Sequence, residues 1–137
     1  ATTRRSIDDP IYEFAKSEGI ETYRGSCNDV YQRSLETCKK YNFNLFARIC
    51  GDRPFLDHEL ITMAIKIYKK EKVDLVTTLH PRTYPPGLTR EIINYNLLNK
   101  YNSKVTSEFD REHLTTFFYK NSKNLHNLVS SVPGQKH

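Results

Sequence analysis

A carboxylate directly follows an apolar run at Gly51 and Asp52. The apolar residues of this run are Leu45, Phe46, Ala47, Ile49 and Cys50. A short continuous run of this kind is typical of a strand that is covered on both faces. Gly51 permits a turn, and Pro54 prevents further strand pairing. Since ligands of open α/β sheets bind beyond the carboxyl ends of the strands, we expect Asp52 to face a ligand and to hold a hard divalent cation.

Strands and helices alternate along the rest of the chain. We expect strands over 20–24, 45–50, 73–78 and 89–94, and helices over 9–19, 28–41, 57–70 and 110–118, with a further helix after 94. The expected N-terminal caps are Asp9, Asn28 or Asp29, Asp57 and Asp110. This alternation indicates βαβ units, an α/β fold and a mostly parallel sheet. The tail from Asn121 onward is polar and poorly patterned.

The length and the charge limit the possible functions. The chain has 137 residues, of which 37% are hydrophobic, so we expect a single domain over 1–137. Its net charge of +5 comes from lysines and arginines spread along the whole length. A solvated basic surface is the first interpretation, and an anionic ligand such as a nucleotide is the second. No aromatic stacking motif or basic recognition helix indicates RNA or DNA binding.

The cysteines and the apolar runs indicate the compartment. Cys27, Cys38 and Cys50 are odd in number and have no CxxC spacing, so we expect reduced thiols in the core. No apolar run approaches the length of a membrane span, and no leader opens the chain. We therefore expect a cytoplasmic protein without membrane partners. The histidines at 58, 80 and 113 lack the spacing of a zinc site.

Five ordered pieces of sequence resemble a known family. They are Tyr23-Arg-Gly-Ser26, Asn28-Asp-Val30 with Arg33, Arg48-Ile-Cys-Gly-Asp-Arg-Pro54, Arg82-Thr-Tyr-Pro-Pro-Gly-Leu88 with Glu91, and Arg111-Glu-His-Leu-Thr115. In this order and spacing they resemble the cytidylyltransferase family. The resemblance is strongest to the branch of the spore coat polysaccharide biosynthesis protein F, which is related to the acylneuraminate and 3-deoxy-manno-octulosonate cytidylyltransferases. It covers the chain from about Ala1 to Thr115.

The resemblance implies a Rossmann-like nucleotide-diphospho-sugar transferase fold. In such enzymes a sugar oxygen attacks the α-phosphorus of CTP and pyrophosphate leaves, giving a CMP-sugar. Asp52 matches the metal-binding aspartate of the Gly-Asp-x-Pro motif, so the resemblance implies Mg²⁺ as cofactor and Asp52 as catalytic residue and metal ligand. Nucleotidyl transfer depends mainly on neutralising and positioning the phosphates, which is the work of such a metal ion.

The resemblance also assigns residues to the nucleotide and to the sugar. The expected nucleotide-binding set is Arg24, Gly25, Ser26, Asp29 and Gly51. The expected substrate-binding set is Arg48, Tyr84, Gly87, Glu91, Glu112 and His113. The family more often has an acidic residue at the position of Thr89, and this departure bears on the choice of sugar.

Several of these residues have a second, structural interpretation. Asp29 can cap the helix over 28–41 instead of contacting a ligand. Arg48 is either a phosphate ligand or part of an ion pair at a strand edge. Glu112 can compensate a helix N-terminus, and His113 can be a partly buried side chain, as alternatives to contacts with substrate or with a dimer mate.

Further expectations concern the extent of the chain. Cytidylyltransferases open with a strand and a basic phosphate loop, which have no counterpart ahead of Ala1-Thr2-Thr3, the expected end of the second strand. Their later aspartate motif is not recognised in 124–137. We therefore expect the central fragment of a homodimeric enzyme, inactive when isolated. The alternatives are a scaffold domain that keeps the fold without catalysis and, as a weaker one, a nucleic-acid binder.

Overall fold

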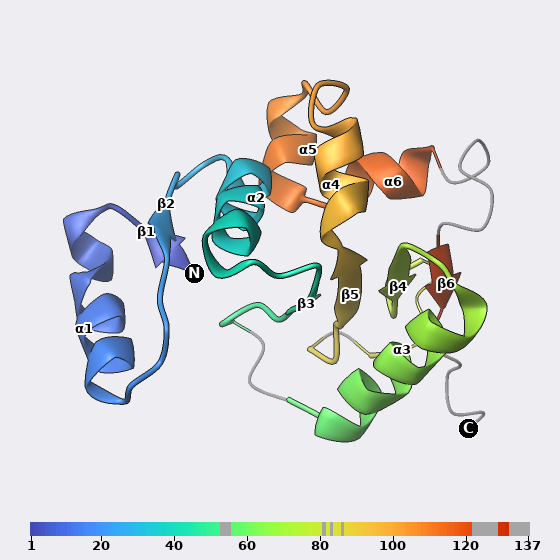
Figure 1. The fold of residues 1–137 in the computed structure, drawn as a ribbon, viewed down its shortest axis with the longest axis horizontal. Helices are drawn as coiled ribbons and strands as arrows, with labels where there is room; N and C mark the ends of the chain where they lie inside the picture. Colours follow the sequence, from blue (N-terminus) through green and yellow to red (C-terminus); the bar gives the residue numbers. More distant parts are fainter. Residues whose placement is uncertain (53–55, 81, 83, 86, 122–128, 132–137) are drawn as a thin grey trace. The chain divides into compact units, whose positions relative to one another are not determined.

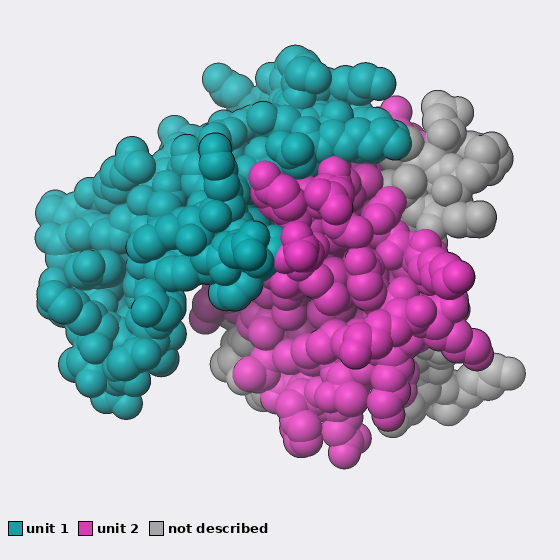
Figure 2. Space-filling view, viewed as in Figure 1, with its two compact units in different colours: residues 1–43, 98–117 teal, residues 44–97, 118–137 magenta. Residues whose placement is uncertain are grey.

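The fold is known from a computed structural model that describes residues 1–52, 56–80, 82, 84–85, 87–121 and 129–131 (Figure 1). Residue contacts divide the chain into two compact units. Unit 1 comprises 1–43 and 98–117, and unit 2 comprises 44–97 and 118–137 (Figure 2). The chain passes between the units at three places. One lies between residues 43 and 44, and the other two fall within α4 (Tyr95–Tyr101) and α6 (Thr116–Lys120). In the described part of the chain, no helix is long and apolar enough to cross a membrane.

Unit 1 contains a short parallel pair of strands and several helices. Strand β1 (Thr2–Thr3) pairs with β2 (Arg24–Gly25), and a 3-10 turn (Ser6–Asp8) leads into α1 (Asp9–Ser17). Helix α2 (Val30–Tyr41) packs against α5 (Glu108–His113). The core of this unit consists of Tyr31, Leu35, Cys38, Leu98, Val105 and Leu114, all of them buried. Burial raises the pKa of the Cys38 thiol, as expected for a cysteine in a core.

Unit 2 contains a mixed sheet with the order β3-β5-β4-β6. Its strands are β3 (Leu45–Arg48), β4 (Leu75–Thr77), β5 (Glu91–Asn94) and β6 (Val129–Ser131). Strand β5 is antiparallel to β3 and to β4, whereas β4 is parallel to β6. Three strands of this sheet therefore share one direction and β5 opposes them, which confirms the predicted mixed α/β sheet. Two of its three described pairings are antiparallel, because β5 lies between β3 and β4.

Helix α3 (His58–Glu71) packs against this sheet and forms the core of unit 2. The buried residues of that core are Leu60, Ala64, Val73, Val76 and Ile92. The predicted cap is confirmed, because the Asp57 carboxylate accepts the backbone N–H groups of Glu59 and Leu60 at 2.9 and 3.3 Å. Lys69 and Lys70 lie in the last turn, where a cation is favoured by the helix dipole.

The apolar run before Gly51 forms an edge strand, not a covered one. Within the described residues, β5 is the neighbour of β3 in the sheet. Leu45 and Phe46 are only half-buried, Ala47 is exposed, and Ile49 is 42% exposed. The interpretation of this strand as covered on both faces is therefore wrong. An apolar run does not say which strands lie inside a sheet. The two inner strands of this sheet are β5 and β4, and β4 is buried at every residue.

Several predicted boundaries also need correction. The strand expected over 20–24 is reduced to β2, and Asp8 precedes α1 as its cap, with Asp9 as the first helical residue. Asp110 lies inside α5, whose cap is Ser107. The helix expected over 110–118 is broken at Leu114 (φ 60°, ψ −53°), where the Thr115 N–H bonds back to the His113 carbonyl at 2.6 Å. The polar and poorly patterned tail contains β6.

Candidate functional site

Polar side chains from three strands lie at one end of the sheet in unit 2. Strand β3 ends at Arg48, β4 ends at Thr77, and β5 begins at Glu91. Because β5 runs in the opposite direction, Glu91 is in register with both Arg48 and Thr77. Tyr119 of α6 and His80 join them through the contacts given below. We call Arg48, Thr77, His80, Glu91 and Tyr119 the sheet-end cluster.

A buried carboxylate is the centre of the sheet-end cluster. The Glu91 side chain is 1% exposed, and its Oε2 accepts from Arg48 Nη1 at 2.8 Å. The Tyr119 hydroxyl donates to Oε1. The Arg48 side chain is 23% exposed. The anion of this pair is therefore inside the unit, whereas its cation reaches the surface, so the strand-edge ion pair that the sequence left as one alternative for Arg48 is present.

Two further residues extend the sheet-end cluster. The oxygens of the Thr77 and Tyr119 hydroxyls are 2.8 Å apart, and the Leu79 N–H donates to the Thr77 hydroxyl at 2.9 Å. The His80 ring stacks on the Tyr119 ring with 5.1 Å between centroids and 13° between planes. Sequence reasoning missed Thr77 and Tyr119. A threonine in a buried strand and a tyrosine after two phenylalanines carry no pattern that indicates a site.

The predicted turn at Gly51 and Asp52 is present, and both residues are exposed. A Cβ atom added at Gly51 would meet no atom within 4 Å, so nothing in the chain crowds this position. Pro54 lies outside the described residues. The described part of the chain holds no group of three or more His, Cys, Asp and Glu side chains that could bind a metal ion.

The loop before β5 contains the other residues expected near a sugar. Tyr84 is half-buried and packs against the core of unit 2. Gly87 has φ 99°, a backbone conformation that residues with side chains rarely adopt. Thr89, at the position where the family more often has an acidic residue, is half-buried, and its carbonyl accepts from Arg90 Nη1 at 2.6 Å.

In unit 1, the segment expected near the nucleotide makes many contacts within the chain. Arg24 donates to the carbonyls of Thr3 and Arg5 at 2.8 and 2.9 Å, and pairs with Asp9 at 2.6 Å. A Cβ atom added at Gly25 would lie 2.8 Å from Arg33 Cγ. Gly25 therefore permits close packing of the chain on itself.

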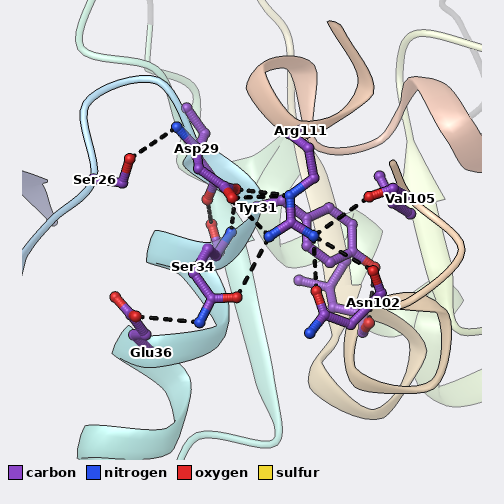
Figure 3. A network of polar contacts seen from close by, with 11 residues as sticks. Ser26, Asp29, Tyr31, Ser34, Glu36, Asn102, Val105 and Arg111 are labelled. Carbon is purple, nitrogen blue, oxygen red and sulfur yellow. Dashed lines mark hydrogen bonds and ion pairs between the residues drawn. The ribbon is translucent and has the colours of Figure 1, made fainter. Parts of the chain in front are cut away.

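Asp29 and Arg111 form the centre of the polar network in Figure 3. Asp29 Oδ1 accepts from the Gln32 N–H at 2.7 Å. Asp29 therefore caps α2, which is the structural alternative predicted for it. Arg111 Nε and Nη2 donate to Asp29 Oδ2 at 2.9 and 2.7 Å. The Ser26 hydroxyl accepts from the Asp29 N–H at 3.0 Å, which fixes the turn before the helix.

The two residues after Arg111 differ in exposure. Glu112 is exposed on α5. His113 is half-buried, and its ring meets the edge of Phe109 at 4.3 Å between centroids. The partly buried side chain predicted as one alternative for His113 is present, whereas contacts of Glu112 and His113 with a substrate stay predictions.

The predicted site residues are divided between the units. Unit 2 contains Arg48, Gly51, Asp52, Tyr84, Gly87 and Glu91. Unit 1 contains Arg24, Gly25, Ser26, Asp29, Glu112 and His113. Within unit 2, the structure brings Arg48 and Glu91 into direct contact and places Gly51 and Asp52 three and four residues after Arg48.

A family comparison covers both units. The sequence model of a family described as cytidylyltransferase matches residues 1–136. The chain belongs to the cytidylyltransferase family. The match extends beyond Thr115, where the resemblance in the sequence ended, and it includes α6 and Tyr119.

Two curated relatives are similar over most of the chain. The chain is 32% identical over 121 residues to the uncharacterized protein MJ1063 of Methanocaldococcus jannaschii, covering 88% of the chain and 49% of that protein. It is 28% identical over 119 residues to the spore coat polysaccharide biosynthesis protein SpsF of Bacillus subtilis, covering 85% and 48%. The chain thus spans about half the length of these relatives.

A solved structure supports the fold. A cytidylyltransferase from Leptospira borgpetersenii is similar with a TM-score of 0.88 and 29% identity, covering 98% of the chain and 56% of that structure. The predicted nucleotide-sugar transferase type of fold is therefore confirmed for this cytidylyltransferase family member.

Proposed function

We propose that the complete protein containing this chain is a CTP-dependent sugar nucleotidyltransferase. It transfers CMP to an acidic sugar or a sugar of a surface polysaccharide and releases pyrophosphate. The observation that carries this proposal is the family match over 1–136, with the Gly51–Asp52 turn directly after the strand that ends at Arg48. The relatives named for spore coat polysaccharide biosynthesis and for cytidylyltransferase support the choice of reaction.

The chemistry assigns separate roles to the residues of unit 2. Asp52 is an exposed carboxylate in a turn, and we propose that it holds Mg²⁺ together with phosphate oxygens of CTP. That metal ion would neutralise charge on the phosphates as the bond to pyrophosphate breaks. We propose that the loop before β5, with Tyr84 and Gly87, faces the sugar. Arg48 is proposed to bind an anionic group of a substrate.

In unit 1, the proposed nucleotide contacts come from the turn between β2 and α2. Arg24 and Asp29 are already bound within the chain, so their side chains would hold this turn in shape. Ser26 and the backbone around Gly25 are then the proposed direct contacts with the nucleotide. Glu112 and His113 remain proposed contacts with the substrate or with the partner subunit of a homodimer.

Release of pyrophosphate from CTP tests this function. The complete protein is incubated with CTP, Mg²⁺ and a panel of acidic sugars, and pyrophosphate is measured by a coupled assay. We expect sugar-dependent release that EDTA abolishes and that Asp52→Ala lowers at least about 100-fold, because a metal ligand is lost. Glu71→Ala, which removes an exposed carboxylate from the end of α3, is the matched control and should keep full activity.

The alternative of a scaffold without catalysis predicts another result. A scaffold would release no pyrophosphate with any sugar and would show no magnesium-dependent binding of CTP in titration calorimetry. We also propose that residues 1–137 alone are inactive. Pyrophosphate release by the isolated 137 residues, abolished by Asp52→Ala, would contradict that part. Gel filtration with light scattering checks the proposed homodimer, and cell fractionation the proposed cytoplasmic location.

A further inference from the structure

We propose that Arg48 binds an oxyanion of the substrate, and that Glu91 and Tyr119 are positioning residues which hold Arg48 for that contact. The inference deepens the proposed function and rests on it for the choice of probes. Tyr119 has no role in the assignments made above from the sequence. Its role follows from the contacts of the sheet-end cluster.

The difference in burial between Arg48 and Glu91 is the first step. The Glu91 side chain is 1% exposed and that of Arg48 is 23% exposed. Glu91 Oε2 accepts from Arg48 and Oε1 from Tyr119, so both oxygens of the carboxylate have partners. A ligand that reaches this end of the sheet meets the guanidinium before the carboxylate. Glu91 is therefore placed to act through Arg48 and not by touching the ligand.

The direction of the hydroxyl bonds is the second step. A phenol has one proton, and that of Tyr119 goes to Glu91. In the contact of 2.8 Å between Thr77 and Tyr119, the Thr77 hydroxyl must then be the donor. The Thr77 oxygen in turn accepts from the Leu79 N–H. Each donor in this series of hydrogen bonds is thus directed toward the Glu91 carboxylate. The series fixes the orientation of that carboxylate against Arg48.

The chemistry of arginine gives the class of ligand. A guanidinium binds carboxylate and phosphate groups through parallel N–H donors, and this geometry is lost when the planar group rotates. An arginine whose partner is fixed by Tyr119 loses less side-chain freedom when it binds. The oxyanion can be a phosphate of the nucleotide or the carboxylate of an acidic sugar, and the chemistry at Arg48 is the same for both.

A double-mutant cycle tests the proposal in the complete protein. The probes are pyrophosphate with Mg²⁺ for a phosphate and N-acetylneuraminate for a carboxylate, each titrated by calorimetry. We expect Arg48→Met to weaken one of them about tenfold or more, the loss for a charge-assisted contact. Tyr119→Phe keeps the ring and removes only the hydroxyl, and we expect it to weaken the same probe about threefold through the lost orientation of Arg48.

The coupling between the two changes separates positioning from a general loss of stability. In the Arg48→Met background, Tyr119→Phe should cause no further loss of affinity. Tyr41→Phe is the matched control, because its hydroxyl bonds to the Thr22 carbonyl at 3.0 Å outside the sheet-end cluster. It should leave the affinity for both probes unchanged. If Arg48→Met does not fold, Arg48→Lys replaces it, and the effect of Tyr119→Phe should then be smaller than in the wild type.

Three results would overturn the proposal. One is equal loss of affinity from Tyr119→Phe with and without Arg48. Another is unchanged affinity for both probes in the Arg48 variant. The third is a wild-type protein that binds neither probe. This experiment measures binding and not turnover. If the complete protein releases no pyrophosphate, the affinities of the Arg48 and Tyr119 variants can still be interpreted. If these affinities contradict the role of Arg48, pyrophosphate release remains a separate test of the proposed reaction.

Discussion

Asp29 and Arg111 are 82 residues apart in the sequence, yet Arg111 Nη2 lies 2.7 Å from Asp29 Oδ2 and Nε lies 2.9 Å from the same oxygen. The pair joins the first turn of α2 to α5 within unit 1. The guanidinium also donates to Asn102 Oδ1 at 2.8 Å and lies over the Tyr31 ring at 4.9 Å. Asp29 therefore combines capping with an ion pair, and Arg111 connects three segments of the unit.

Loss of the ion pair between Asp29 and Arg111 should destabilise the protein. We expect Arg111→Ala to lower the free energy of unfolding by about 2–3 kcal/mol, because several charge-assisted bonds are lost together. Arg111→Lys should cost about 1–2 kcal/mol, since an ammonium keeps the charge without the planar fork. Urea denaturation measures both. Lys66→Ala, at an exposed position of α3, is the control and should change the free energy little; equal stability of Lys66→Ala and Arg111→Ala would contradict the role of the pair.

Tyr31 predicts a dependence of stability on alkaline pH. Burial raises the pKa of Tyr31 above its ordinary value, and the nearby Arg111 opposes this only in part. The unfolded chain loses this proton near pH 10, so the contribution of Tyr31 is intact below about pH 10 and is lost as the pH rises above it.

Tyr31→Phe isolates that contribution. At neutral pH it should cost about 1 kcal/mol, because the bond of 2.7 Å from the Tyr31 hydroxyl to the Leu98 carbonyl is lost. Between pH 9 and 11, values chosen around the pKa of about 10 for free tyrosine, stability should fall more steeply in the wild type than in this variant. Parallel curves for the two proteins would show that Tyr31 does not titrate in this way.

Local sequence signals predicted most of the fold because they act within a few residues. Asp29 and Asp57 were expected as caps, and each accepts backbone N–H groups of the helix that follows it. The break at Leu114 has no such signal, because this fully buried residue adopts a positive φ that tertiary packing must hold. Local patterns do not determine the order of the strands either. The apolar run of β3 therefore predicts a covered strand, whereas β3 lies at the edge of the sheet that the described residues form.

The site was predicted in part for the same reason. The Gly51–Asp52 turn follows from local sequence, and the pairing of Arg48 with an acid was one expected alternative. Tyr119 lies 28 residues from Glu91, and only the fold brings its hydroxyl to that carboxylate. Contacts of such separation leave no periodicity in the sequence, so they could not be found there.

The end of α3 offers a stabilising substitution. Lys72 is exposed and adopts φ 52°, ψ 40° as the C-cap of α3. Glycine has no Cβ penalty in this conformation, so Lys72→Gly should raise the free energy of unfolding by about 0.5–1 kcal/mol. Asn42 has nearly the same angles (φ 56°, ψ 42°) at the end of α2, but asparagine tolerates them. Asn42→Gly should therefore change stability less than Lys72→Gly, as thermal unfolding can measure.

The glycines of the two predicted ligand segments should respond differently to alanine. At Gly25 a new Cβ would lie 2.8 Å from Arg33 Cγ and 3.0 Å from Tyr23 Cε1. We expect Gly25→Ala to lower the free energy of unfolding by about 1–3 kcal/mol, as overpacking of a buried position does.

At Gly51 the same change meets no atom within 4 Å, so the melting temperature should be unchanged. If the backbone at Gly51 approaches a nucleotide as proposed, Gly51→Ala should still weaken CTP binding in the complete protein, measured by calorimetry with Mg²⁺. A Gly51→Ala protein with normal melting temperature and normal CTP affinity would remove Gly51 from the proposed nucleotide contacts, whatever the result for Gly25→Ala.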